Sequence, residues 1–131
     1  MVLLSCATSN EELTPRTHTD GNPSLVAVIA EPERFDGMTI GTVGVLEHEA
    51  DVTMLYISPL DAENNVMGNG IAIEFEPGSK TATLAKDFDG QYVYARGIFG
   101  FDSRRYRGLP SGVLTQVNEL FGPEDIGANR R

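Results

Sequence analysis

The sequence predicts a small, mainly β protein that folds as a closed or partly closed barrel. Its 131 residues, 40% of them hydrophobic and one of them cysteine, suit a single domain with a hydrophobic core and no disulfide. Apolar and polar residues alternate in several short runs, as in half-buried strands. One signature also occurs twice: Asp-Gly, two residues, an aliphatic residue, three residues, Gly, an aliphatic residue and a bulky apolar residue.

The two copies of this signature span residues 36–46 and 89–99. In each copy Asp-Gly forms a turn into a strand, and the first aliphatic residue, Ile40 or Val93, is expected to face the core. The later glycine suits a bulge or sharp bend, where a bare Cα tolerates close approach of another chain segment. Two bent strands of this kind favour a small barrel.

The remaining elements follow from residue spacing and turn residues. Ser24 can cap a short helix that ends before Pro32, and the segment from there to Gly37 is expected to be a turn. A helical turn is expected to begin at Pro59. Strands are expected from Met38 and over 53–57, 71–76 (half-buried) and 91–101; residues 80–88 are ambiguous, and 113–120 form a strand or a short helix.

One combination of segments extends over most of the chain. A short helix leads through Glu-Pro-Glu at residues 31–33 into a strand that ends Gly44-Val45-Leu46, followed by segments 55–58 and 61–62. With these segments, roughly residues 24–120 resemble small uncharacterised bacterial proteins with an OB-like barrel, many of which are lipoproteins. The resemblance implies a five- or six-stranded OB-like barrel with one or two short helices, and it supplies no catalytic residues.

The N-terminus resembles a bacterial lipobox, because residues 3–6 read Leu-Leu-Ser-Cys and Cys6 would be the lipidated residue. The polar segment that follows cannot bury enough apolar area to offset the cost of ordering it. A lipid on Cys6 would hold the protein at the cell envelope, and the alternative is a frayed terminus with a free thiol on a cytoplasmic protein. We expect a disordered tether over 1–23, the barrel domain over 24–122 and a polar tail over 123–131.

The charge is uneven along the chain. The net charge is −9, and the basic side chains gather in the last third, with a dense run at residues 104–107. A negative field repels phosphate backbones, but OB barrels bind single strands by stacking bases on aromatic side chains beside a basic groove. The alternative is a solvated loop beside ordinary cross-strand packing. The candidate ligand-binding residues are Tyr92, Tyr94, Arg96, Arg104, Arg105, Tyr106 and Arg107.

No motif in the sequence points to catalysis. Glu47, Glu49 and Asp51 would share the face of a solvated strand end, with His48 on the other face, so they are not expected to share a metal. We therefore expect a non-catalytic module that binds an unknown protein or small ligand without cofactor or metal, and that reaches a membrane only through a lipid on Cys6. The alternatives are a cytoplasmic protein that binds single-stranded nucleic acid and an acid-dependent hydrolase.

Overall fold

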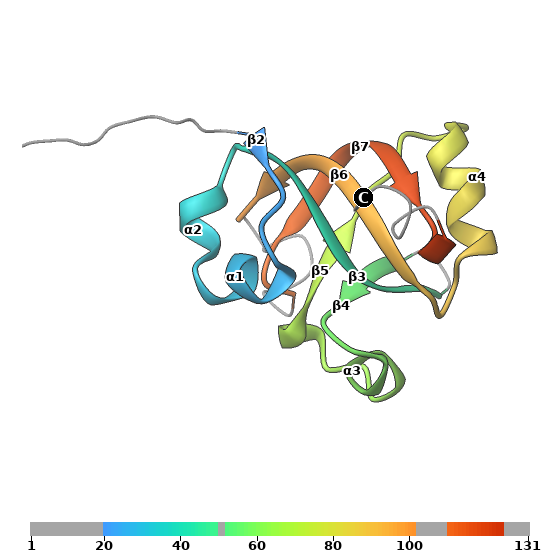
Figure 1. Ribbon diagram of the computed structural model, residues 1–131, viewed down its shortest axis with the longest axis horizontal. Coiled ribbons are helices and arrows are strands. Elements are labelled where there is room, and N and C mark those ends of the chain that lie inside the picture. Colours follow the sequence, from blue (N-terminus) through green and yellow to red (C-terminus); the bar gives the residue numbers. More distant parts are fainter. Residues whose placement is uncertain (1–19, 50–51, 102–109, 125–131) are drawn as a thin grey trace, which may run out of the picture.

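The computed structural model describes residues 20–49, 52–101 and 110–124. Five strands follow one another around a closed ring (Figure 1), and only the β5–β7 pair within the ring is parallel. This is the strand order of an OB-fold barrel, so the expected fold class is confirmed. In ring order the strands are β3 (Thr39–Glu49), β4 (Val52–Tyr56), β5 (Gly70–Ile73), β7 (Val113–Phe121) and β6 (Tyr92–Gly100), which pairs back with β3.

The two copies of the repeated signature pair with each other. They form the antiparallel β3–β6 ladder, in which Ile40 lies opposite Gly97 and Gly44 lies opposite Val93. The buried aliphatic residue of each copy therefore faces the mid-strand glycine of the other. The ladder has local two-fold symmetry, which follows from one sequence pattern used twice.

Each Asp-Gly corner contacts the far end of the other copy. Gly37 and Gly90 have φ angles of +82° and +83°, a region that glycine adopts without steric cost. The N–H of Gly37 donates to the carbonyl of Phe99, and the N–H of Gly90 donates to the carbonyl of Leu46, both at 2.7 Å. The expected turns are confirmed, and they also extend the ladder at both ends.

The expected bend at a mid-strand glycine takes the form of a bulge on the neighbouring strand. The β6–β7 register shifts between Arg96 and Ile98, and Gln116 in β7 has a φ angle of +52°. A Cβ atom at Gly97 would lie 2.5 Å from the backbone oxygen of Thr115. Glycine is therefore required where the bulged strand crosses β6.

Short helices close the barrel at both ends. Figure 1 shows α1 (Leu25–Ala30) and α2 (Pro32–Phe35) at one end and α4 (Lys80–Asp87) at the other. Residues 80–88 are thus mainly helical, and Ser79 caps this helix through its hydroxyl. The buried side chains that these helices add to the core are Leu25, Val28, Phe35 and Ala85.

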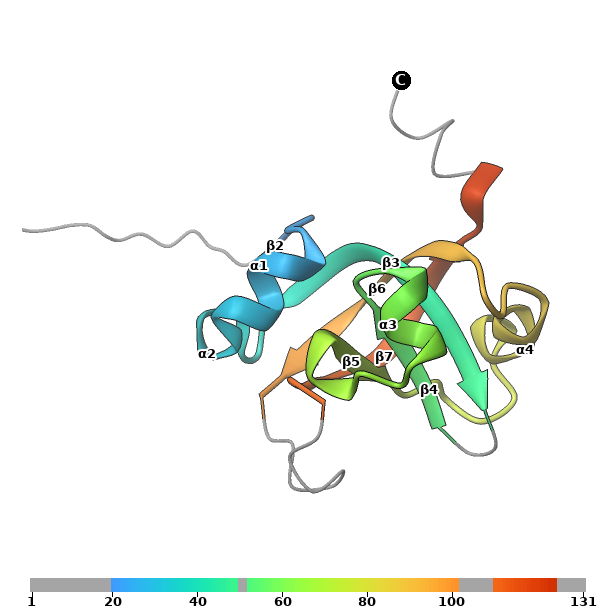
Figure 2. The same ribbon diagram turned by 90° about the horizontal axis from the view of Figure 1, so that it is seen from below.

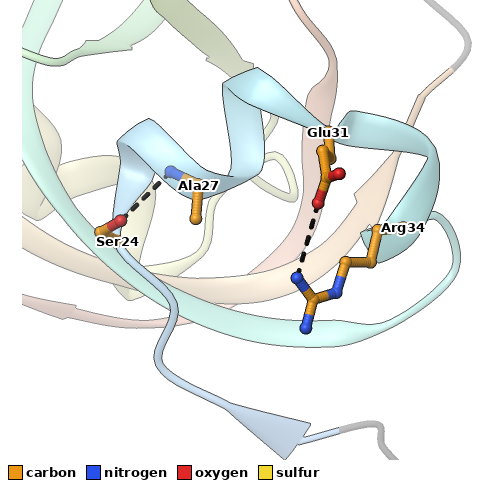
Figure 3. A network of polar contacts seen from close by, with 4 residues as sticks. All are labelled: Ser24, Ala27, Glu31 and Arg34. Atoms are coloured by element: carbon orange, nitrogen blue, oxygen red, sulfur yellow. Dashed lines mark hydrogen bonds and ion pairs between the residues drawn. The ribbon is translucent and has the colours of Figure 1, made fainter.

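The first helix begins as the sequence predicts, because the Ser24 hydroxyl accepts a hydrogen bond from the N–H of Ala27 at 3.1 Å (Figure 3). The turn expected from residue 31 to Gly37 is wrong for residues 32–35, where a second helix forms with Pro32 in its first turn. Proline is favoured at that position because its fixed φ suits a helix start and its missing N–H needs no partner. Glu31 and Arg34 form an exposed ion pair at 3.5 Å.

A second apolar cluster lies outside the barrel, against β4 and β5. The connection between these strands forms α3 (Pro59–Glu63) and η3 (Met67–Asn69), which cover this face (Figure 2). A half-buried strand was expected over 71–76. The strand is shorter, since it ends at Ile73, and its outer face is not exposed, because Ala72 is completely buried under the cover. The members of this outer cluster are Val45, Met54, Tyr56, Ala62, Ala72 and Val113, with Val52 and Met67 partly buried against them.

Two further expectations need correction. The described residues contain four short α-helices and one 3-10 helix instead of one or two helices, because the connections between strands are themselves helical. The barrel unit begins before residue 24, since β2 (Asp20–Gly21) pairs in parallel with the start of β3. The segment 113–120, expected to be a strand or a short helix, is a strand. In the described part of the chain, no helix is long and apolar enough to cross a membrane.

Candidate functional site

The predicted outward stripe is present on β6. Val93 and Ala95 are completely buried, so Tyr92, Tyr94 and Arg96 point to the outer face, as expected. Tyr92 is the most open of the three, with 45% of its surface exposed. The other candidates, which are Cys6, Arg104, Arg105, Tyr106 and Arg107, lie outside the described residues.

Tyr94 is held by the protein itself. Its ring stacks on Phe121, with the centroids 5.6 Å apart and the planes inclined by 13°. Its hydroxyl donates a hydrogen bond to Oδ1 of Asn22 at 2.8 Å. The ring lies across β3 at Gly41, where a Cβ atom would collide with the Tyr94 hydroxyl and with Asn22. Tyr94 therefore joins the N-terminal segment to the barrel.

A pocket lies beside Tyr94, between the segment that enters α1 and the first half of β3. Its volume is about 350 Å³, within the range of ~300–1,000 Å³ that is typical of small-molecule sites. None of the described residues in its walls is charged. The residues that line the pocket are Asn22, Pro23, Ser24, Leu25, Val26, Gly41, Thr42, Val43, Ile57 and Tyr94.

Thr42 gives this pocket its most distinctive feature. Only 1% of its surface is exposed, and its hydroxyl has no hydrogen-bond partner in the described part of the chain. Buried polar atoms are nearly always paired, because an unpaired one loses its water without compensation. The other two buried threonines are paired: Thr53 bonds the His48 ring at 2.8 Å, and Thr81 donates to the carbonyl of Val117 at 3.0 Å.

The sequence reasoning missed Asn22, Gly41 and Thr42 as parts of a site. A signal was available for Thr42, because the alternation in β3 placed it on the same inward face as Ile40. A hydroxyl on an inward strand face needs a partner or a ligand. Asn22 gave no such signal, since it belonged to a segment expected to be disordered.

The acidic end of β3 is a second polar region. Burial, together with the nearby charges of Asp89, Glu49 and Glu63, raises the pKa of the Glu47 carboxyl above its ordinary value of 4.5. The His48 ring beside it bonds Thr53. Among the described residues, no three His, Cys, Asp or Glu side chains lie together in a way that could hold a metal ion.

The face that OB barrels generally use for oligonucleotides is covered in this protein. That face is formed by the second and third strands of the barrel, which are β4 and β5 here. Ala62 of α3 and Met67 of η3 pack on the outer side chains Met54 and Tyr56 of β4. The pocket beside Tyr94 lies at a different part of the barrel and is the better candidate for a binding site.

No family model and no curated protein matches the sequence. The structure is similar to two OBodies bound to hen egg-white lysozyme, each 18% identical, over 85% of this chain and 97% of the OBody, with TM-scores of 0.46 and 0.47. A putative aspartyl-tRNA synthetase from Leishmania major Friedlin is 7% identical over 88% of this chain and 22% of the synthetase, with a TM-score of 0.46. At these values the assignment of an OB-like barrel rests on the strand order.

Proposed function

We propose that this protein is a non-catalytic binding module that takes its ligand in the pocket between α1 and β3. The observation that carries the proposal concerns Thr42, a residue that lines the pocket: its buried hydroxyl has no partner among the described residues. A ligand that bonds this hydroxyl would remove the cost of leaving it unpaired. The walls are apolar with a few convergent polar groups, which is the usual composition of ligand pockets.

A nuclear magnetic resonance screen of neutral, anionic and cationic fragments tests this proposal. Binding in the pocket is expected to shift the amide signals of Val26, Thr42 and Val43 in a saturable way. If no fragment of any charge class shifts these amides, the pocket is not a binding site and the proposal fails. A panel of esters, phosphate esters, glycosides and peptides tests for catalysis. If the protein turns over any of them and a pocket variant such as Thr42→Val does not, the protein is an enzyme and the proposal of a non-catalytic module is wrong.

The alternative function, binding of single-stranded nucleic acid, has a separate test. It requires exposed aromatic rings beside a basic groove. The ring of Tyr94 already stacks on Phe121, and its hydroxyl already donates a hydrogen bond to Asn22. We expect a labelled oligonucleotide not to bind at low salt. Binding that falls steeply with salt and is lost in the double variant Arg104→Ala/Arg105→Ala would favour the alternative.

We also propose that a lipid on Cys6 tethers the module to a bacterial envelope membrane. The support is the Leu-Leu-Ser-Cys sequence at residues 3–6 and the polar segment that separates it from β2. Two acyl chains give a stable anchor, whereas one chain binds membranes only marginally. Intact mass measurement of protein from a bacterial host, expressed from its full-length gene, is expected to show the acyl mass on Cys6. Unmodified Cys6 would remove the tether and favour a cytoplasmic protein.

A further inference from the structure

The pocket beside Tyr94 selects for the charge of its ligand. The ten described residues that line it include no Asp, Glu, Lys, Arg or His, and five of them present aliphatic or proline side chains. An ion that entered would lose hydration without gaining a counter-charge. The net charge of −9 adds a general repulsion of anions. The ligand is therefore expected to be neutral and mostly apolar.

The wall formed by β3 offers backbone groups as well. On the edge that faces the pocket, β3 pairs with β2 only at Thr39 and Ile40, and with β4 only from Val45 onward. In the intervening stretch, no described strand pairs with this edge. The interval coincides with the part of β3 that lines the pocket.

The ladder with β6 shows which residue of this interval turns toward the pocket. The carbonyl of Met38 accepts a hydrogen bond from the N–H of Phe99 in β6, and the N–H of Leu46 donates to the carbonyl of Gln91 just before β6. Both residues have even numbers, and the register between them is continuous. In an antiparallel ladder, alternate residues direct both N–H and C=O to opposite edges. Val43 therefore directs its N–H and C=O away from β6, toward the unpaired edge, and its neighbour Thr42 carries the unpartnered hydroxyl.

We infer that the pocket binds a compact cyclic amide of the lactam type, an inference that rests on the proposed function. A lactam places an N–H donor and a C=O acceptor side by side on an apolar ring. The paired groups match a peptide edge such as that of Val43 together with a hydroxyl that can donate or accept. The ring matches the aliphatic walls, and the molecule carries no charge.

Three related probes test the inference by amide shifts of the full-length protein. ε-Caprolactam is expected to bind saturably with a dissociation constant of roughly millimolar size, and N-methylcaprolactam about fivefold more weakly because it has lost its donor. 6-Aminohexanoate, the ring-opened analogue, carries one ammonium and one carboxylate group, and it is expected not to bind. Thr42→Val is expected to weaken caprolactam binding by about fivefold. The matched control Thr81→Val, a buried threonine outside the pocket, is expected to leave it unchanged.

The outcomes separate this inference from the proposed function. Equal binding of caprolactam to the wild type and to Thr42→Val, or no binding of caprolactam at all, would overturn the inference. If caprolactam fails while another neutral or charged fragment shifts Val26, Thr42 and Val43, the pocket is a binding site for a different class of ligand. If nothing shifts these amides, both the inference and the proposed function fail.

Discussion

The carboxylate of Asp89 accepts a hydrogen bond from the backbone N–H of His48 at 2.7 Å, although 41 positions separate the two residues. Asp36 accepts the equivalent bond from the N–H of Phe101 at 2.9 Å. Asp36 and Asp89 hold the same place in the two copies of the repeated signature. Each carboxylate therefore fixes the far end of the strand formed by the other copy, and the β3–β6 pair is locked at both ends.

Removal of either carboxylate is expected to destabilise the barrel by a similar amount. Asp36→Ala and Asp89→Ala should each lower the free energy of unfolding by about 1–2 kcal/mol, because a hydrogen bond between a carboxylate and an amide is stronger than a neutral one. Asn at either position keeps the accepting oxygen and should recover about half of the loss. Urea unfolding measures these differences. A loss at one position and none at the other would contradict the symmetry.

Gly97 is expected to tolerate no side chain. A Cβ atom there would lie 2.5 Å from the backbone oxygen of Thr115, which cannot move without the bulge in β7. Gly97→Ala should therefore cost about 1–3 kcal/mol of stability. Gly100 lies in the same strand, and its added Cβ would meet nothing closer than 3.9 Å, so Gly100→Ala serves as the control. Equal effects of the two substitutions on thermal unfolding would rule out this account of the glycine.

The cover over β4 and β5 predicts a large difference between two residues that both point out of the barrel. Met54 is buried under α3 and η3, so Met54→Ala should cost about 2–5 kcal/mol. Val43 is 41% exposed on the outer side of β3, and Val43→Ala should stay within about 0.5 kcal/mol. Denaturant unfolding compares them. A small effect at Met54 would mean that the cover is not closed in solution.

The stability of the protein is expected to depend on the ionisation of Glu47. Burial, followed by the charges of Asp89, Glu49 and Glu63, raises its pKa in the folded state above 4.5, so the folded protein binds more protons than the unfolded chain between the two pKa values. The free energy of unfolding contributed by Glu47 therefore falls as pH rises through this window. Glu47→Gln should be more stable than the wild type at about pH 7 and equal to it below about pH 4.

The control for this pH dependence is Glu76→Gln, which removes the same charge from an exposed position after β5. Unfolding in urea at both pH values measures the free energies. An advantage of Glu47→Gln that persists unchanged at low pH would show that the substitution acts through packing and not through the carboxylate charge.

The repeat, the Asp-Gly corners and the β3–β6 strands could be predicted from the sequence because each depends on local residue chemistry. The second helix was missed because Pro32 was interpreted as a stop signal, although proline also begins helices. The strand that contains Ala72 was expected to have one solvent-exposed face, since Ala72, Glu74 and Glu76 alternate with large apolar residues. Its burial depends on a cover contributed by another segment, which alternation alone does not reveal.

The candidate site was predictable only in part. The outward positions of Tyr92 and Tyr94 follow from strand alternation, and the structure places them there. The bond from Tyr94 to Asn22 joins residues 72 positions apart, and no local pattern indicates it. The pocket depends on the same contact, because it forms only where the N-terminal segment returns to β3. Residue spacing along a single strand does not predict a tertiary contact between segments that are far apart in the sequence.

The most direct test of the central claim is the stability of Thr42→Val in the absence of any ligand. Valine has the shape of threonine and no hydroxyl, so the account predicts a rise in the free energy of unfolding of about 1 kcal/mol or more, because an unpaired buried hydroxyl has been removed. Thr81→Val, which loses a formed hydrogen bond, should instead be destabilised. If Thr42→Val is destabilised as Thr81→Val is, the hydroxyl already has a partner within the folded protein, and the pocket has no unmet group for a ligand.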